Sequence, residues 1–226
     1  MKSRLLYQGT NSAVEFFLNK NESIKAESDA MLSMSATIDV DGKMEGGVFA
    51  GLGRMLSGEK FFFQTLKASR GEGHVLLAPS KPGDICLLEL DGTTEYSVQK
   101  DGFLAGTDNI KVSTQMQNLV KGLFSGEGFF ILKIGGVGTL ALSAFGAIHE
   151  INLAPGEEMI VDNDHLVAWP STTSYTVEKA SAGWISSFTS GEGFVCRFKG
   201  PGKIFIQSRN INSFANWIKG YVQKVK

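Results

Sequence analysis

The chain has 226 residues, of which 42% are hydrophobic and 20% charged; this composition is typical of a folded globular protein and excludes an intrinsically disordered chain. Its 22 basic and 23 acidic side chains leave a formal net charge of −1. A chain so close to neutral has no general electrostatic attraction to nucleic acid or anionic lipid, so binding of either needs a local basic patch.

The composition also indicates β structure and a reducing compartment. The chain has 27 Gly against 5 Pro, and such an excess of glycine is typical of tight turns and bulges because glycine adopts positive φ without steric cost. Cys86 and Cys196 each lie in an apolar, strand-like run, so we expect two unpaired thiols. The N-terminal segment lacks the apolar core of a signal peptide. We therefore predict a cytoplasmic protein.

Short apolar runs bounded by Gly, Pro and Asp follow one another along most of the chain. Their Phe, Val, Ile, Leu and Thr content predicts strands at 61–66, 75–78, 85–90, 129–134, 139–143, 167–169, 173–178, 194–199 and 204–207. The segment 129–148 is long enough to span a bilayer, but Gly135, Gly136 and Gly138 divide it. We predict two buried strands joined by a glycine turn there.

One short motif occurs three times. Ser-Gly-Glu followed by an apolar run stands at 57–59, 125–127 and 190–192, and a glycine opens a second apolar run shortly after each copy. Weaker matches relate 82–85 to 155–158 and 106–112 to 161–167. We predict an all-β domain over 1–209 with three internal repeats at about 1–99, 100–158 and 159–209, of the β-sandwich or double-stranded β-helix type.

The segment 53–60, GRMLSGEK, resembles a phosphate-binding loop, but the resemblance does not hold. Glu59 separates the last glycine from the lysine, no Ser or Thr follows that lysine, and the other two copies replace it with glycine. We interpret Glu59, Glu127 and Glu192 as turn carboxylates that accept backbone N–H groups. The alternative is that the three converge on an internal pseudo-axis and bind a cation or a partner's basic groups.

Residues 210–226 predict an amphipathic helix, which Asn210 or Asn212 would cap. The apolar positions that share one helical face are Phe214, Trp217, Ile218, Tyr221, Val222 and Val225. The lysines on the other side are Lys219, Lys224 and Lys226. We expect this helix to pack on the domain or on a neighbouring subunit; the alternative is an anionic membrane, with Trp217, Lys219, Tyr221 and Lys224 as contacts to a partner or to lipid.

The recurring glycine-glutamate turns and the PGD and PGE turns resemble those of the altered-inheritance-of-mitochondria family, over residues 20–218. The resemblance implies a three-repeat β fold similar to the subunit of the tryptophan RNA-binding attenuation protein, assembled as a homotrimer. It supplies no catalytic residues.

The chemistry-bearing residues predict no catalytic or metal centre. His74, His149 and His165 lack the paired-histidine spacing of a β-helix metal site, so we expect no metal and no cofactor. The basic residues of the predicted β domain that could contact RNA are scattered: Lys67, Arg70, Lys133, Arg197 and Lys199. We predict a non-catalytic, trimeric β scaffold that binds a protein or a membrane. The alternatives are a metal- or small-molecule-dependent enzyme with a β-roll cavity and an RNA-binding ring.

Overall fold

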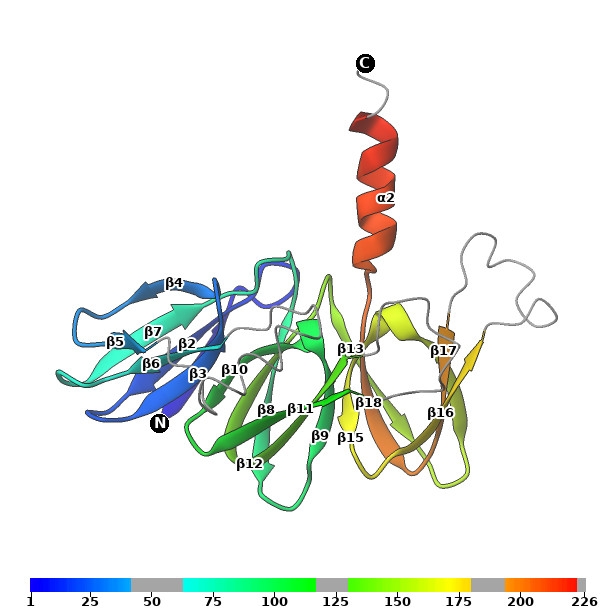
Figure 1. Ribbon diagram of the computed structural model, residues 1–226, viewed down its shortest axis with the longest axis horizontal. Helices are drawn as coiled ribbons and strands as arrows, with labels where there is room; N and C mark the ends of the chain where they lie inside the picture. The colour runs from blue at the N-terminus through cyan, green and yellow to red at the C-terminus, as the bar shows by residue number, and fades with distance from the viewer. Residues whose placement is uncertain (42–62, 117–129, 180–193, 223–226) are drawn as a thin grey trace.

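The computed structural model describes residues 1–41, 63–116, 130–179 and 194–222. In these residues the fold is mostly β, with a single α-helix at the C-terminal end, as predicted. The strands form a row of three β units, with the N-terminal part of the chain at one end and the C-terminal part at the other (Figure 1). The helix projects from this row.

The first unit contains seven strands: β1 (Lys2–Leu6), β2 (Ala13–Leu18), β3 (Ser23–Glu27), β4 (Met31–Met34), β5 (Asp39–Asp41), β6 (Phe63–Lys67) and β7 (Gly73–Leu77). Strand β7 lies between β2 and β4, and β1 extends that sheet beyond β2. Strand β6 lies between β3 and β5. All of these pairs are antiparallel.

The second unit contains β8 (Ile85–Asp91), β9 (Tyr96–Gln99), the short 3-10 helix η1 (Lys100–Gly102), β10 (Phe103–Thr107), β11 (Ile110–Met116) and β12 (Phe130–Ser143). Strand β12 belongs to two ladders, because its first half pairs with β9 and β11 and its second half with β8 and β10. The predicted turn inside 129–148 is therefore wrong. Gly136 and Gly138 take φ of 103° and 138° within the strand, which redirects the chain without ending the ladder.

The third unit contains β13 (Ile148–Leu153), β14 (Glu158–Asp162), the 3-10 helix η2 (Asn163–His165), β15 (Leu166–Pro170), β16 (Ser174–Lys179), β17 (Phe194–Lys199) and β18 (Gly202–Gln207). Strand β18 lies between β13 and β15, and β17 lies between β14 and β16. The helix α2 (Ile211–Val222) follows directly.

The three units share one pairing order over residues 13–77, 85–143 and 148–207. Counted from β2, β8 and β13, the first and third strands of each unit flank its last strand, and the second and fourth strands flank the strand before the last. In the middle unit, β12 takes the place of both of these central strands. These limits differ from the predicted divisions after residues 99 and 158. Descent of the three units from one ancestral module stays a prediction.

Two of the sequence matches do not fall at corresponding places. Residues 82–85 lead into β8, the first strand of its unit, whereas 155–158 connect the first and second strands of the next unit. Residues 106–112 span the connection from β10 to β11, whereas 161–167 span η2. Both matches are therefore wrong as repeat markers. The three Ser-Gly-Glu turns lie outside the described residues.

Each unit has its own apolar core. The three clusters centre on Phe16 and Leu66, on Phe103 and Leu142, and on Trp169 and Phe198. Two antiparallel pairs connect neighbouring units, β3 with β10 and β9 with β15. The three units therefore form one continuous body, from which the helix projects.

Candidate functional site

The predicted contact residues lie together on α2, as far as the structure describes them. Trp217, Lys219 and Tyr221 are on this helix, and Lys224 lies outside the described residues. The turn carboxylates Glu59, Glu127 and Glu192 also lie outside the described residues, so their proposed roles stay predictions.

The start of α2 is fixed to the body by polar contacts. Asn210 caps the helix as predicted, because its side-chain oxygen accepts the Ser213 N–H at 3.0 Å. The Asn210 side-chain amide donates to Asp164 Oδ2 at 3.0 Å, and the Asn212 amide donates to the same oxygen at 3.4 Å. One carboxylate of η2 therefore binds the first residues of the helix.

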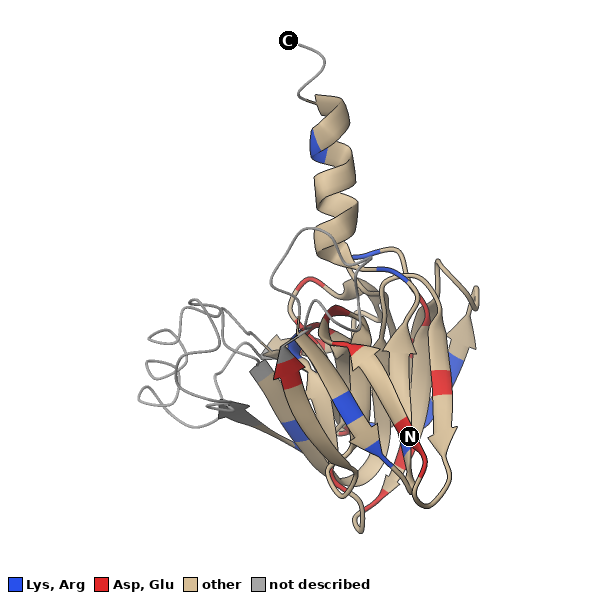
Figure 2. Cartoon of the chain, turned by 90° about the vertical axis from the view of Figure 1, so that its right-hand side faces the viewer, with Lys and Arg blue, Asp and Glu red and all other residues tan. Residues whose placement is uncertain are grey.

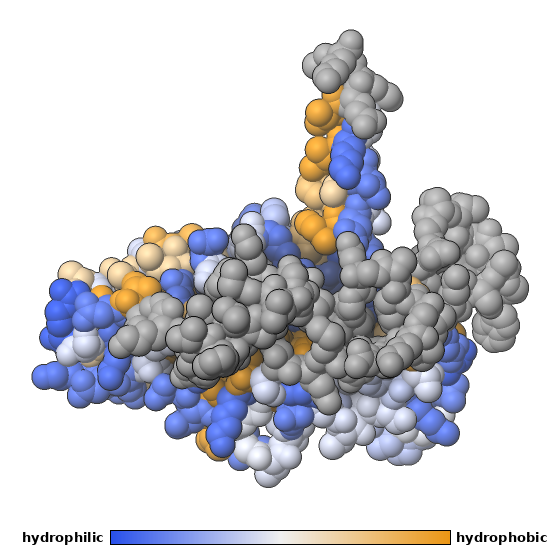
Figure 3. All heavy atoms as spheres, viewed as in Figure 1, coloured by the Kyte–Doolittle hydropathy of each residue, from blue (hydrophilic) through white to orange (hydrophobic). Residues whose placement is uncertain are grey.

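Beyond its first turn, α2 stands away from the body with its apolar face uncovered. The exposed fractions are 42% for Phe214, 59% for Trp217, 40% for Ile218, 59% for Tyr221 and 64% for Val222. Space-filling atoms show apolar residues along one side of the helix and hydrophilic residues along the other (Figure 3). The described part of the body therefore does not cover this face, and packing against a neighbouring subunit stays a prediction.

Aromatic rings run in a continuous series from the body along the helix. Phe145 meets Phe214 edge-on at 5.3 Å between ring centroids, Phe214 stacks on Trp217 at 5.8 Å, and Trp217 meets Tyr221 at 5.1 Å. The first of these contacts anchors the apolar face to the end of the second unit. The others bring Trp217 and Tyr221 into contact along the helix without burying them.

Charge is distributed unevenly between the helix and the body. Lysines, arginines and carboxylates are interspersed over the strands, whereas α2 carries one basic position and no acidic one (Figure 2). Residues 210–226 contain three lysines and no Asp or Glu. The C-terminal segment is thus locally basic on a chain that is nearly neutral.

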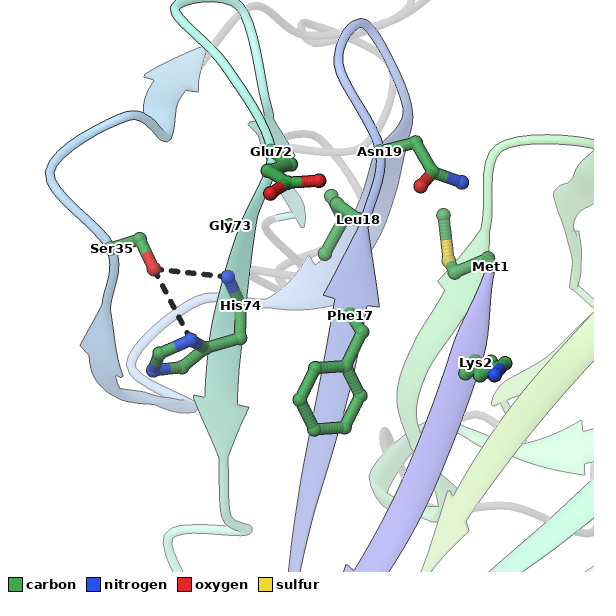
Figure 4. A pocket seen from close by; sticks show the side chains of 9 residues that line it. All are labelled: Met1, Lys2, Phe17, Leu18, Asn19, Ser35, Glu72, Gly73 and His74. Atoms are coloured by element: carbon green, nitrogen blue, oxygen red, sulfur yellow. Dashed lines mark hydrogen bonds between the residues drawn. The ribbon is translucent and has the colours of Figure 1, made fainter.

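A second candidate site is an open groove of about 680 Å³ on the first unit (Figure 4). It lies over β1, β2 and β7 and is lined by Met1, Lys2, Phe17, Leu18, Asn19, Ser35, Glu72, Gly73 and His74. Two of these lining residues, Ser35 and His74, come together with Glu15 in the order of a hydrolase triad. Sequence reasoning missed this set, because the three residues are far apart in the chain and only the β2–β7–β4 pairing brings them together.

The geometry of this trio is that of a cross-strand contact. Ser35 Oγ accepts the backbone N–H of His74 at 3.0 Å and lies 3.3 Å from its Nδ1, so the hydroxyl is bound to the neighbouring strand. Glu15 lies 4.0 Å from His74 Nε2 but only 2.6 Å from Arg4, which is its closer partner. Because the serine is held in place by the ladder and the carboxylate by an arginine, the trio supports no catalytic assignment.

Several other titratable groups have structural partners. Lys133 donates to the hydroxyls of Ser97 and Ser171, both at 2.8 Å, and burial lowers its pKa. Arg70 pairs with Asp39 at 2.9 Å, and Arg197 pairs with Glu178 at 2.9 Å. Three of the five basic residues that could contact RNA are therefore engaged with protein groups. Cys86 and Cys196 are both free, and burial raises the pKa of Cys196 to about 12.

No group of three or more metal-binding side chains is close enough to hold an ion in the described ranges. In those same ranges, no helix has the length and apolar character that crossing a bilayer requires.

Comparison with known proteins agrees with the fold. Residues 3–209 match the family model described as Mitochondrial biogenesis AIM24. The chain belongs to the AIM24 family. An uncharacterized protein of Streptococcus pyogenes serotype M6 is 36% identical over 218 residues, which cover 92% of this chain and 86% of that protein.

Two further relatives extend the comparison. The altered inheritance of mitochondria protein 24 of Verticillium alfalfae is 29% identical over 117 residues, which are 51% of this chain and only 30% of that longer protein. The crystal structure of a Streptococcus pyogenes protein matches with a TM-score of 0.79 and 33% identity, over 97% of this chain and all of that one. The family and the mostly β fold with a C-terminal helix, both predicted from the sequence, are thus confirmed, whereas the three internal repeats stay a prediction. The likeness to the attenuation protein stays a prediction.

Proposed function

We propose that this AIM24-family protein is a non-catalytic β scaffold that docks on an anionic membrane surface through the apolar face of α2. The observation that carries the proposal is the exposure of five large apolar side chains along one side of a helix whose first residues are hydrogen-bonded to the body. A contiguous exposed apolar surface of this kind marks an interaction site.

The composition of the helix favours lipid over a protein groove as the occupant. Trp217 and Tyr221 have apolar rings with polar tips, which suits the boundary between headgroups and acyl chains. Lys219 lies on the helix, and residues 210–226 include no acidic residue, so an anionic surface attracts the segment without a repulsive contribution of its own. Each lysine near such a surface contributes about 1 kcal/mol.

The attachment of the helix to the β body supports a role in docking. The Asp164 contacts and the Phe145–Phe214 ring contact fix the base of α2, so a helix about 18 Å long is presented with its aromatic residues already ordered. Less side-chain conformational freedom is then lost on docking. We also propose that the protein works as an oligomer in the cytoplasm, a homotrimer being the number that the family resemblance implies.

Vesicle flotation tests the membrane proposal. The wild-type protein is mixed with phosphatidylglycerol-containing vesicles or with phosphatidylcholine vesicles, and we expect flotation with the anionic ones only. The double variant Trp217→Ser and Tyr221→Ser should lose at least about tenfold in affinity. Tyr7→Ser is the matched control, because Tyr7 is 75% exposed on the body and its loss should leave flotation unchanged.

Failure of the wild-type protein to float would contradict the membrane proposal. Equal flotation of the wild type and the double variant would exclude α2 as the docking element. Unchanged melting temperatures of the variants establish that the body remains folded in each comparison.

A further inference from the structure

The groove on the first unit has an aromatic floor. Phe17 is the one exposed position of β2, an inner strand of its sheet, and the residue is 39% exposed. The ring of His74, on the neighbouring strand β7, lies 6.3 Å from the Phe17 ring and is tilted by 50° to it. Both side chains line the groove (Figure 4). A flat ligand ring can therefore stack on Phe17 with one edge toward His74.

An exposed lysine stands on one side of this floor. Lys2 of β1 pairs directly with Phe17 across the ladder, and side chains at such paired positions are close neighbours on one face of the sheet. The ammonium group of Lys2 has neither an ion pair nor a hydrogen bond with any residue that the structure describes. Arg4, further along the same strand, is instead held by Glu15 at 2.6 Å. Lys2 is therefore available to an anionic ligand.

A carboxylate stands on the other side. Glu72 directly precedes β7, and because β2 lies between β1 and β7, Lys2 and Glu72 reach the groove from opposite sides of the Phe17 strand (Figure 4). The backbone oxygen of Glu72 accepts the Thr37 hydroxyl at 2.8 Å, whereas its carboxylate has no partner within the described ranges. An acidic side chain beside a stacked ring is the acceptor that ribose hydroxyls find in dinucleotide-binding proteins.

The three groups together define the chemistry of the ligand. The volume of the groove, about 680 Å³, lies within the range of sites that hold small organic molecules, about 300–1,000 Å³. An apolar ligand would leave Lys2 and Glu72 without partners, and inorganic phosphate would leave the aromatic floor uncovered. A flat base, hydroxyl groups and an anionic group within one small molecule satisfy all three.

We propose that this groove binds a nucleoside monophosphate, with its base stacked on Phe17, its phosphate paired with Lys2 and its ribose hydroxyls donating to Glu72. The interaction is binding without a chemical step, so Ser35 and His74 contribute to the wall of the site and not to a reaction. The groove belongs to the first unit, whereas α2 follows the third. The inference therefore goes beyond the membrane proposal and does not rest on it.

Titration of the full-length chain with AMP, GMP, CMP and UMP, followed by nuclear magnetic resonance, tests the site. We expect amide shifts concentrated in β1, β2 and β7. Phe17→Ala should weaken binding by roughly tenfold or more, because it removes the stacking surface. Lys2→Gln should weaken it by roughly threefold to tenfold at low salt and by less at high salt. Tyr7→Ala and Lys67→Gln are the matched controls, because both residues are exposed and neither lines the groove.

Adenosine and ribose 5-phosphate separate the contributions of the base and the phosphate. Each should bind at least about fivefold more weakly than AMP, because each lacks one of the two groups. Circular dichroism checks the folding of each variant, and Lys2→Gln changes an exposed side chain, so it decides the question even if Phe17→Ala does not fold.

The proposal is overturned if no mononucleotide shifts the amide signals at millimolar concentration, or if the affinity survives both Phe17→Ala and Lys2→Gln. Adenosine that binds as tightly as AMP would also overturn it, because the phosphate would then contribute nothing. Binding of a single-stranded oligonucleotide without binding of any mononucleotide would replace the proposed ligand by a strand and overturn it as well.

Discussion

Trp169 and Trp217 are the same residue type in two regions of the molecule that treat it in opposite ways. Trp169 is fully buried among Tyr175 and Phe198 in the third unit, whereas Trp217 is 59% exposed on α2. The aromatic side chains around Trp169 pack against one another inside the third unit, whereas those of the helix are accessible. The contrast separates residues that stabilise the scaffold from residues that are available to a partner.

The largest expected effect comes from exchanging the two tryptophans for alanine. Trp169→Ala should lower the free energy of unfolding by about 3–5 kcal/mol, because it leaves a cavity among buried rings. Trp217→Ala should change it by less than about 0.5 kcal/mol, since the side chain is mostly in water. Urea denaturation measures both. Similar losses in the two variants would mean that α2 is covered by something in solution.

A half-buried carboxyl in the body gives a smaller, pH-dependent effect. Burial raises the pKa of Glu27 to about 7, despite the attraction of Lys81, and the nearby Asp101 and Asp29 raise it further while Lys100 lowers it. Between pH 4.5 and about 7 the folded state holds a proton that the unfolded state has released, so this group destabilises the fold as pH rises through that window.

Glu27→Gln removes that charge. We expect the variant to be more stable than the wild type by about 1 kcal/mol at pH 8, after allowance for solvent screening of a half-buried group, and equal to it at pH 4. Thermal melts at the two pH values measure this. A variant that is less stable at pH 8 would show that the ionised carboxylate is stabilised by its neighbours.

Removal of the helix cap should affect α2 alone. Asn210→Ala deletes the hydrogen bond to the Ser213 N–H and one contact to Asp164. The stability of the helix should therefore fall by about 1 kcal/mol, while the melting temperature of the body stays the same. Far-ultraviolet circular dichroism follows the melting of the body, and flotation reports on the helix. A lower melting temperature of the whole protein would instead make the cap part of the body.

The smallest expected effect concerns the charge on α2. Lys219→Gln should weaken binding to anionic vesicles by roughly threefold to fivefold at low salt, with a smaller difference at high salt. Vesicle titration in the two buffers measures it. Equal binding of the variant and the wild type would leave the apolar face as the sole attraction.

Local patterns allowed the sequence to predict α2 and many strands. The cap at Asn210 and the apolar face of the helix follow from spacing alone, and several predicted runs lie close to strand limits, as β17 and β8 do. The strand β12 was predicted as two, because glycines that normally form a turn here bend a strand that continues.

What the sequence could not supply is the result of long-range pairing. The Ser35, His74 and Glu15 contact depends on the register of three strands. Nothing in the local sequence shows that Leu104 is fully buried whereas Leu32 is 59% exposed, because this difference arises only when the units pack together. Periodicity likewise predicts that α2 has an apolar face but not what covers it. Burial is a property of the assembled fold.

Hydrogen exchange of α2 tests the central claim most directly. Amide exchange of residues 211–222 is measured in the protein alone, with phosphatidylcholine vesicles and with anionic vesicles. The membrane proposal predicts slower exchange in this segment with anionic vesicles only, while exchange in the strands stays the same. Exchange that is unchanged by anionic vesicles, or equally slow in the absence of any lipid, would contradict it.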